Sequence, residues 1–170
     1  MPASEAESEA LRRQFAGPTA YVDAGEGEPI VFIHGVGLQA DAWQPQIESF
    51  RHTHRVIAID MLGHGSSEPA SGNAMLADYV QQVKDLLDAL GVTRANIVGH
   101  SMGGQVAIGF ALSHPARTLR LAALNCVYER TDEQRAAVVA RARQLESTGS
   151  TGDIEAPLRR WFGADALQSP

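Results

Sequence analysis

Residues 99–103 read Gly99-His100-Ser101-Met102-Gly103, and a further glycine, Gly104, follows them. A serine between two glycines, placed where a strand passes into a helix, is the pattern of a nucleophile elbow. The glycines allow a sharp turn with little side-chain crowding, so the hydroxyl of Ser101 projects from its tip. The amide of Met102 then lies at the helix N-terminus, where unpaired N–H groups and the helix dipole stabilise a negative oxygen. The segment predicts serine-based nucleophilic catalysis; the plainer alternative is a tight glycine-rich turn with a capping serine.

Two further segments with glycines each come at the end of an apolar run. His34-Gly35-Val36-Gly37 follows the run 30–33, and Asp60-Met61-Leu62-Gly63-His64-Gly65-Ser66-Ser67 continues the run 55–60. A loop at the same sheet edge as the serine can offer a second backbone donor to a developing oxyanion. We therefore expect these two segments to lie beside the elbow.

Strands and helices must alternate to bring these loops together. Apolar runs at 19–23, 30–33, 55–60, 95–98 and 119–126 predict strands. Helical spacing of apolar residues predicts helices from Asp41 to about Phe50, from Asn73 to Leu90 and over 102–112, with Asp41 and Asn73 as N-caps. This alternation is typical of a parallel sheet with helices on both faces.

The pattern changes after Tyr128. Thr131 and Gln134 predict the start of a helix that runs to about Glu146, and residues 147–152 read as a linker. We expect three parts: a tail or short helix over 1–17, a core over 18–128, and the start of a helical cap over 129–170.

The three motifs, in this order and strand context, resemble the α/β-hydrolase superfamily over about residues 20–128. The resemblance implies a three-layer α/β core with a mostly parallel sheet and Ser101 as nucleophile. It implies an oxyanion hole made by the backbone amides of Val36 and Met102 and shaped by His34 and Gly35. It also implies a set of residues that brace the adjoining loop: Asp60, Gly63, Gly65 and Ser66.

Within the superfamily, the core is most similar to small cytoplasmic ester and lactone hydrolases. The segment Leu158-Arg159-Arg160-Trp161-Phe162 resembles 3-oxoadipate enol-lactonases and their relatives. The resemblance thus implies a small-molecule ester or lactone as substrate, with no metal and no organic cofactor. A serine at position 101 disfavours the dehalogenase and epoxide-hydrolase branches, and His100 disfavours the C–C bond hydrolases.

A catalytic serine needs a base and an orienting acid, and in this superfamily both follow the serine in the chain, the acid first. No histidine lies beyond position 114. His114 is at the far end of the helix that starts beside Ser101, on the order of 15 Å away at about 1.5 Å per residue. His64 is the least unfavourable substitute. We therefore expect the triad acid and histidine to be absent, the C-terminal strands to be missing, and this C-terminally truncated chain to be nearly inactive alone.

Two other classes compete with this interpretation. Gly35-Val36-Gly37-Leu38-Gln39-Ala40 follows a strand, and Asp60 comes twenty residues after Ala40, which fits a dinucleotide-binding Rossmann fingerprint. Asp41 as helix cap disfavours it, because the fingerprint needs the helix to open within the glycines, and Ser101 stays unexplained. A non-enzymatic, hydrolase-like binding or interaction protein is favoured by the absent base and disfavoured by the complete elbow.

Composition excludes several partners. The 170 residues carry a net charge of −6, with a pI near 5.4 and a mean hydropathy of −0.15. Such a surface repels phosphate backbones and anionic lipid, so neither nucleic acid nor a membrane is expected. The single cysteine, Cys126, excludes an internal disulfide, and the acidic N-terminus lacks the features of a signal or transit peptide, which predicts a cytoplasmic protein. His52 and His54 lack a third metal ligand nearby; the roles of Trp43 and Trp161 and the oligomeric state stay open.

Overall fold

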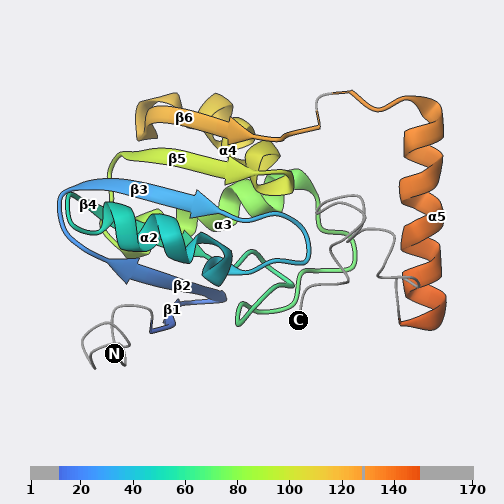
Figure 1. Ribbon diagram of the computed structural model, residues 1–170, viewed down its shortest axis with the longest axis horizontal. Coiled ribbons are helices and arrows are strands. Elements are labelled where there is room, and N and C mark those ends of the chain that lie inside the picture. The colour runs from blue at the N-terminus through green and yellow to red at the C-terminus, as the bar shows by residue number, and fades with distance from the viewer. Residues whose placement is uncertain (1–11, 128, 150–170) are drawn as a thin grey trace, which may run out of the picture. The chain divides into compact units, whose positions relative to one another are not determined.

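The computed structural model describes residues 12–127 and 129–149 (Figure 1). The chain divides into two compact units, Met1–Val127 and Tyr128–Pro170, each of which is described by itself.

The first unit is built on a six-stranded sheet in the order β1-β2-β4-β3-β5-β6 (Figure 1). The four strands from β4 to β6 are parallel, and β1 and β2 join antiparallel at the β4 edge. The strand bounds are β1 Gln14–Ala16, β2 Thr19–Ala24, β3 Glu28–Ile33, β4 His54–Ile59, β5 Ala95–His100 and β6 Thr118–Leu124. The predicted mostly parallel sheet is therefore confirmed.

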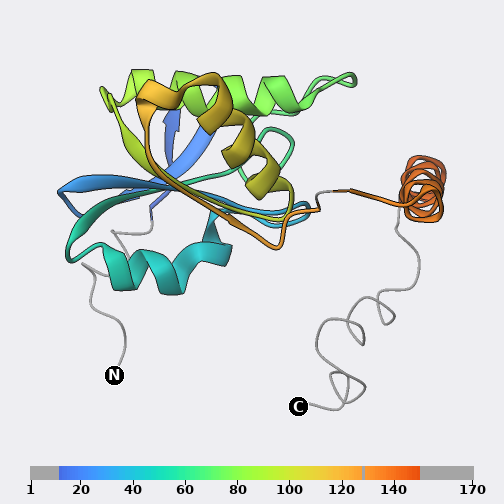
Figure 2. The same cartoon turned by 90° about the horizontal axis from the view of Figure 1, so that it is seen from above.

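Helices cover both faces of this sheet, which gives three layers (Figure 2). Helices α3 (Leu76–Ala89) and α4 (Met102–Ser113) lie on one face, and the turn η1 (Ala40–Trp43) with α2 (Gln44–Phe50) lies on the other. A further short turn, η2 (Pro115–Arg117), leads into β6.

Each face of the sheet has its own apolar cluster. Val31 and Ile33 of β3 pack under α3 and α4 in one cluster, while Phe32 belongs to a second cluster with Trp43 and Ile47 on the α2 face. Successive side chains of a strand point to opposite faces, so a strand covered on both sides must be apolar at every position. This explains the unbroken apolar runs 30–33 in β3 and 56–59 in β4, where every residue is buried.

Several element ends differ from the predictions. Gln14–Ala16 form a strand where a tail or short helix was expected, because they pair with β2. Helix α3 begins at Leu76 rather than after a cap at Asn73, since the Asp78 carboxylate accepts the Met75 amide at 2.6 Å. Asp41 is not a helix cap: its carboxylate binds Arg13 and Gln39 instead. Strand β6 ends at Leu124 rather than at the predicted residue 126, because the backbone of Asn125 turns to a φ of +50°.

The described part of the second unit contains helix α5 (Asp132–Thr148). Its predicted start is confirmed: the amide of Gln134 donates to Thr131 Oγ1 at 3.3 Å, and Gln134 Oε1 accepts the amide of Thr131 at 3.1 Å. The helix runs through the beginning of the predicted linker. Residues 158–162, including Trp161, lie outside the described residues. Over the described ranges, no helix is both long and apolar enough to cross a bilayer.

Candidate active site

Ser101 lies between the end of β5 and the first residue of α4, as predicted for an elbow. Its backbone has φ +55° and ψ −117°, a combination that non-glycine residues rarely adopt and that stores strain. The Ser101 amide donates to the carbonyl of Leu124 on β6 at 2.8 Å, which ties the turn to the neighbouring strand. Its hydroxyl does not cap α4 and makes no hydrogen bond to any other residue that the structure describes.

Close backbone contacts explain both elbow glycines. A Cβ at Gly99 would collide with the carbonyl of Gly103, and a Cβ at Gly103 would collide with the carbonyl oxygens of Ile33 and His34. The obstructing atoms are backbone atoms, which a rotamer change cannot move. Gly103 therefore lets the start of α4 pack directly against the end of β3, where the next loop begins.

That next loop, residues 34–39, contacts the elbow. A Cβ placed on Gly35 would lie 3.2 Å from Ser101 Cβ and 3.2 Å from the His100 ring. The amides of Val36, in this loop, and Met102, at the start of α4, donate no hydrogen bond within residues 12–127 and 129–149. The structure thus brings the predicted oxyanion-loop residues to the serine, with two backbone donors uncommitted.

His34 holds the start of this loop from within the core. The side chain is fully buried, its Nδ1 lies 2.7 Å from the carbonyl oxygen of Gly35, and its Nε2 accepts the amide of Met61 at 3.0 Å. Because Nε2 is an acceptor, the proton resides on Nδ1, which donates to Gly35. Burial lowers the pKa of the His34 imidazole, so this neutral tautomer is the stable form.

Asp60, directly after β4, is a fully buried carboxylate that joins three segments. It accepts the amides of Ala40 at 2.7 Å and Ser66 at 2.9 Å, and the guanidinium of Arg13 at 3.0 Å. Gly65 leaves room for it, because a Cβ there would collide with the carboxylate. The predicted bracing segment thus contacts Ala40, the residue directly after the loop 34–39.

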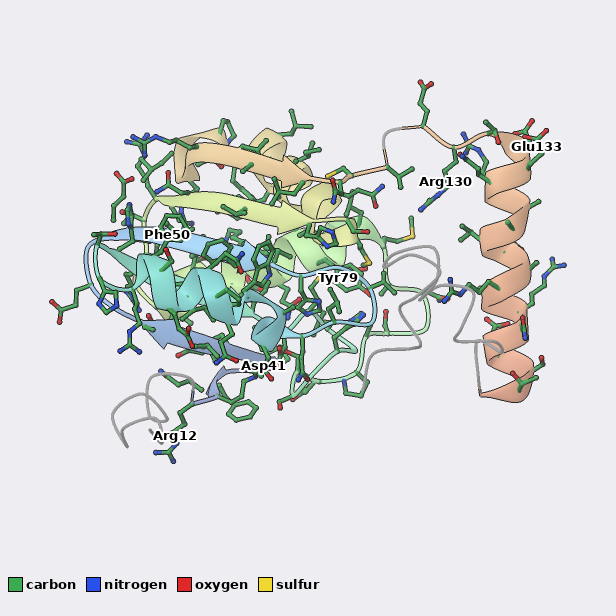
Figure 3. All side chains as sticks on the ribbon, viewed as in Figure 1. Arg12, Asp41, Phe50, Tyr79, Arg130 and Glu133 are labelled. Atoms are coloured by element: carbon green, nitrogen blue, oxygen red, sulfur yellow. The ribbon has the colours of Figure 1, made fainter. Side chains whose placement is uncertain are left out.

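Arg13 also contacts Asp41, which is labelled in Figure 3, with an Nη1–Oδ1 distance of 2.8 Å. Burial works to lower the pKa of the Arg13 guanidinium, but hydrogen bonds and charge attraction from Asp41 and Asp60 outweigh it and raise the pKa. The sequence reasoning missed Arg13, because nothing in its local pattern marks a residue that acts across 47 positions.

Gln82 was also missed. It is buried on α3, where its Oε1 accepts the Leu62 amide at 3.0 Å and its Nε2 donates to Thr19 Oγ1 at 3.1 Å and the Asp60 carbonyl at 3.0 Å. A signal existed: Gln82 is a polar residue within the apolar stripe that includes Val83. Such a residue must satisfy its amide inside the protein.

None of the six histidines reaches the serine hydroxyl within the described residues. His64 Nδ1 lies 3.1 Å from the Leu62 carbonyl oxygen, and its ring packs edge-on against His34 at 5.2 Å between centroids. His114 packs against Phe110 at the other end of α4, with the two rings tilted by 56°. The base expected for a serine nucleophile is therefore not found in this part of the chain.

The remaining candidates lie apart from the elbow. His52 lines a pocket of about 410 Å³ with Arg51 and Asp23, at the end of the sheet where the parallel strands begin. Within the described ranges no three His, Cys, Asp or Glu side chains are grouped to hold a metal ion. Trp43 packs against Phe32 at 4.8 Å in the core on the α2 face, which makes it a packing residue.

The sequence and the fold of this chain are similar to those of known proteins. A family model described as the alpha/beta hydrolase fold matches residues 28–146. The (E)-2-((N-methylformamido)methylene)succinate hydrolase of Acinetobacter baylyi is 44% identical over 148 residues, 87% of this chain and 56% of that protein. The 3-oxoadipate enol-lactonase 1 of the same species is 31% identical over 142 residues, 83% of this chain and 52% of that protein. The solved enol-lactonase from Burkholderia xenovorans LB400 aligns with a TM-score of 0.81 and 29% identity, over 92% of this chain and 62% of that one.

The chain spans about half the length of these two curated relatives. The match nevertheless takes in every strand from β3 onward, the turn at Ser101 and the loop 34–39. The resemblance predicted from the three motifs is therefore confirmed, and the chain belongs to the alpha/beta hydrolase fold family.

Proposed function

We propose that Ser101 is the nucleophile of a hydrolase that cleaves a carboxylic ester or lactone. The Ser101 oxygen attacks the carbonyl carbon and passes its proton to a base. The amides of Val36 and Met102 hold the resulting oxyanion, and the bond to the alcohol oxygen breaks as that oxygen takes the proton. Water then hydrolyses the acyl-serine by the same steps in reverse.

One observation carries this proposal: the strained Ser101 backbone is held with its hydroxyl uncommitted and Gly35 packed against its Cβ. A capping serine in a plain turn would bond the helix amides and needs no such strain. The named relatives, a succinate-derivative hydrolase and an enol-lactonase, support hydrolysis of a small acyl compound.

We further propose that the base and its acid are supplied by a segment outside these 170 residues. Within the described residues no histidine engages Ser101, and the chain covers 56% of the Acinetobacter succinate-derivative hydrolase. Without that base, we expect the 170-residue chain to turn over ester substrates barely above background.

A chimera tests these statements. The part of the Acinetobacter hydrolase that follows its matched region is fused to this chain, and hydrolysis of p-nitrophenyl acetate is measured for the chimera, its Ser101→Ala variant and the unfused chain. We expect turnover by the chimera alone, and a fluorophosphonate adduct on Ser101 by mass spectrometry. A folded chimera that forms no adduct and is unaffected by Ser101→Ala would favour the non-enzymatic, hydrolase-like binding protein.

A further inference from the structure

The oxyanion loop, residues 34–39, is fastened at its two ends to two consecutive residues after β4, Asp60 and Met61. At its start, His34 Nε2 accepts the Met61 amide at 3.0 Å; just past its end, the Ala40 amide donates to Asp60 Oδ1 at 2.7 Å. Between these points the loop has one internal backbone bond, from the Leu38 amide to the Gly35 carbonyl at 3.2 Å. The position of the loop over Ser101 therefore depends on where the Asp60 carboxylate is held.

Arg13 fixes that carboxylate. Asp60 is completely buried, and a buried carboxylate is stable only when it is hydrogen-bonded and paired with a cation. Arg13 is the cation in contact, with Nε 3.0 Å from Oδ2 and Nη2 3.4 Å from Oδ1. Its Nη1 reaches Asp41, the residue after Ala40, at 2.8 Å. One planar guanidinium thus joins the end of β4 to the end of the loop.

We propose that Arg13 is a positioning residue for the oxyanion loop and acts through Asp60 and Asp41. The inference rests on the proposed function, since it assigns Arg13 a role in the chemistry at Ser101. Its physical reason is the rigid fork of the guanidinium, which can hold two carboxylates at fixed angles where an ammonium group cannot.

A matched control lies at the other end of β4. Arg55, the second residue of that strand, makes bonds of 2.6–3.2 Å to Asp23 on β2. The two ion pairs are both partly buried, and each joins a residue in or directly after β4 to the N-terminal part of the chain. The Arg55 pair has no contact with the oxyanion loop, so its removal measures the effect of losing an ion pair as such.

The test compares Arg13→Gln, Arg13→Lys and Arg55→Gln in the full 170-residue chain. The first readout is amide hydrogen exchange of Ala40 and Leu38 by NMR, each relative to the slowest-exchanging amides of β3. We expect Arg13→Gln to speed the exchange of the Ala40 amide by about tenfold or more, because it removes roughly one charge-assisted hydrogen bond. The exchange rate in Arg13→Lys should fall between those of Arg13→Gln and the unmodified chain. Arg55→Gln should change the ratio of the Ala40 rate to the β3 rate by less than about twofold.

The second readout is the rate of fluorophosphonate labelling of Ser101 in the chimera described above. We expect Arg13→Gln to slow labelling by about tenfold and Arg55→Gln to leave it unchanged. Equal exchange and equal labelling in Arg13→Gln and Arg55→Gln would overturn the inference while leaving the proposed nucleophile intact. Absence of labelling in every protein, with Ala40 exchange still specific to Arg13, would refute the proposed function but leave the loop's dependence on Arg13 standing.

Discussion

Replacement of Gly103 by alanine should change the free energy of unfolding in two opposite ways. Gly103 is the second residue of α4, and in an exposed helix alanine is more favourable than glycine by about 1 kcal/mol. At this position, however, the new methyl group would overlap the carbonyl oxygens of Ile33 and His34. Helix propensity alone therefore predicts a more stable protein, and the packing predicts a less stable one.

The packing effect should prevail. Extra methyl groups in a filled core cost about 1–3 kcal/mol even when side chains can move aside, and here the obstructing atoms belong to the backbone. The cost should therefore lie at the upper end of that range, about 3 kcal/mol. After subtraction of the gain in propensity of about 1 kcal/mol, Gly103→Ala should lower the free energy of unfolding by about 2 kcal/mol. With a urea m-value of about 2 kcal/mol/M, the unfolding midpoint should fall by about 1 M.

Gly109→Ala is the matched control in the same helix. A Cβ there would lie 2.9 Å from Val80 Cγ2, a side-chain atom that can shift, so the change in unfolding free energy should stay within about 1 kcal/mol of zero. Urea unfolding is followed by far-UV circular dichroism at low protein concentration, because the exposed Leu121 and Leu124 of edge strand β6 favour association. If Gly103→Ala proves as stable as Gly109→Ala, the tight contact between α4 and β3 is refuted.

Three further predictions concern the site. Ser101→Gly should raise the free energy of unfolding by about 1 kcal/mol in urea, because glycine tolerates a φ of +55°, whereas Ser101→Ala should leave it unchanged. Gln82→Leu should destabilise by about 2–3 kcal/mol through its lost buried hydrogen bonds, while the exposed neighbour Gln81→Leu stays within about 0.5 kcal/mol in the same assay. Burial lowers the pKa of His34 in the folded protein below its ordinary value of 6.5, so protonation of this imidazole favours the unfolded chain. The stability that neutral His34 contributes is therefore complete above pH 6.5 and is lost as the pH falls below that value. His34→Gln should therefore flatten the fall in thermal stability between about pH 6.5 and 5; an unchanged slope would contradict this.

The parallel core could be predicted from sequence because its signals are local. The unbroken apolar run of β3 reports burial on both faces, and the apolar spacing of α3 reports burial on one. Strand β1 gave no such signal, because its three residues are strand only through pairing with β2. The start of α3 was misplaced at Asn73 since Asp78, inside the helix, supplies the capping bond.

The residues of the candidate site likewise divide into those that a local sequence pattern indicates and those that only long-range contacts reveal. Ser101, Gly99 and Gly103 were predicted as elbow residues because one strained turn imposes a short, fixed pattern of residue types. Arg13 and Gln82 were not, because their roles arise from contacts with residues 47 and 22 positions away, around the carboxyl group of Asp60 and its carbonyl. A sequence motif indicates candidate reactive residues more readily than it indicates the residues that hold them in place.

The contacts that arrange Ser101 do not involve a base. Its strained backbone is fixed by the Leu124 carbonyl and by Gly35 packed against its Cβ, and the loop above it is fixed through Asp60 and Ala40. All of these contacts lie within the first unit. Under the proposed function, electrophile binding and proton transfer are therefore separable: the segment proposed to supply a histidine need only reach a hydroxyl that is already in position. This is why the strain at Ser101, measured by Ser101→Gly, should persist in the 170-residue chain even where turnover does not.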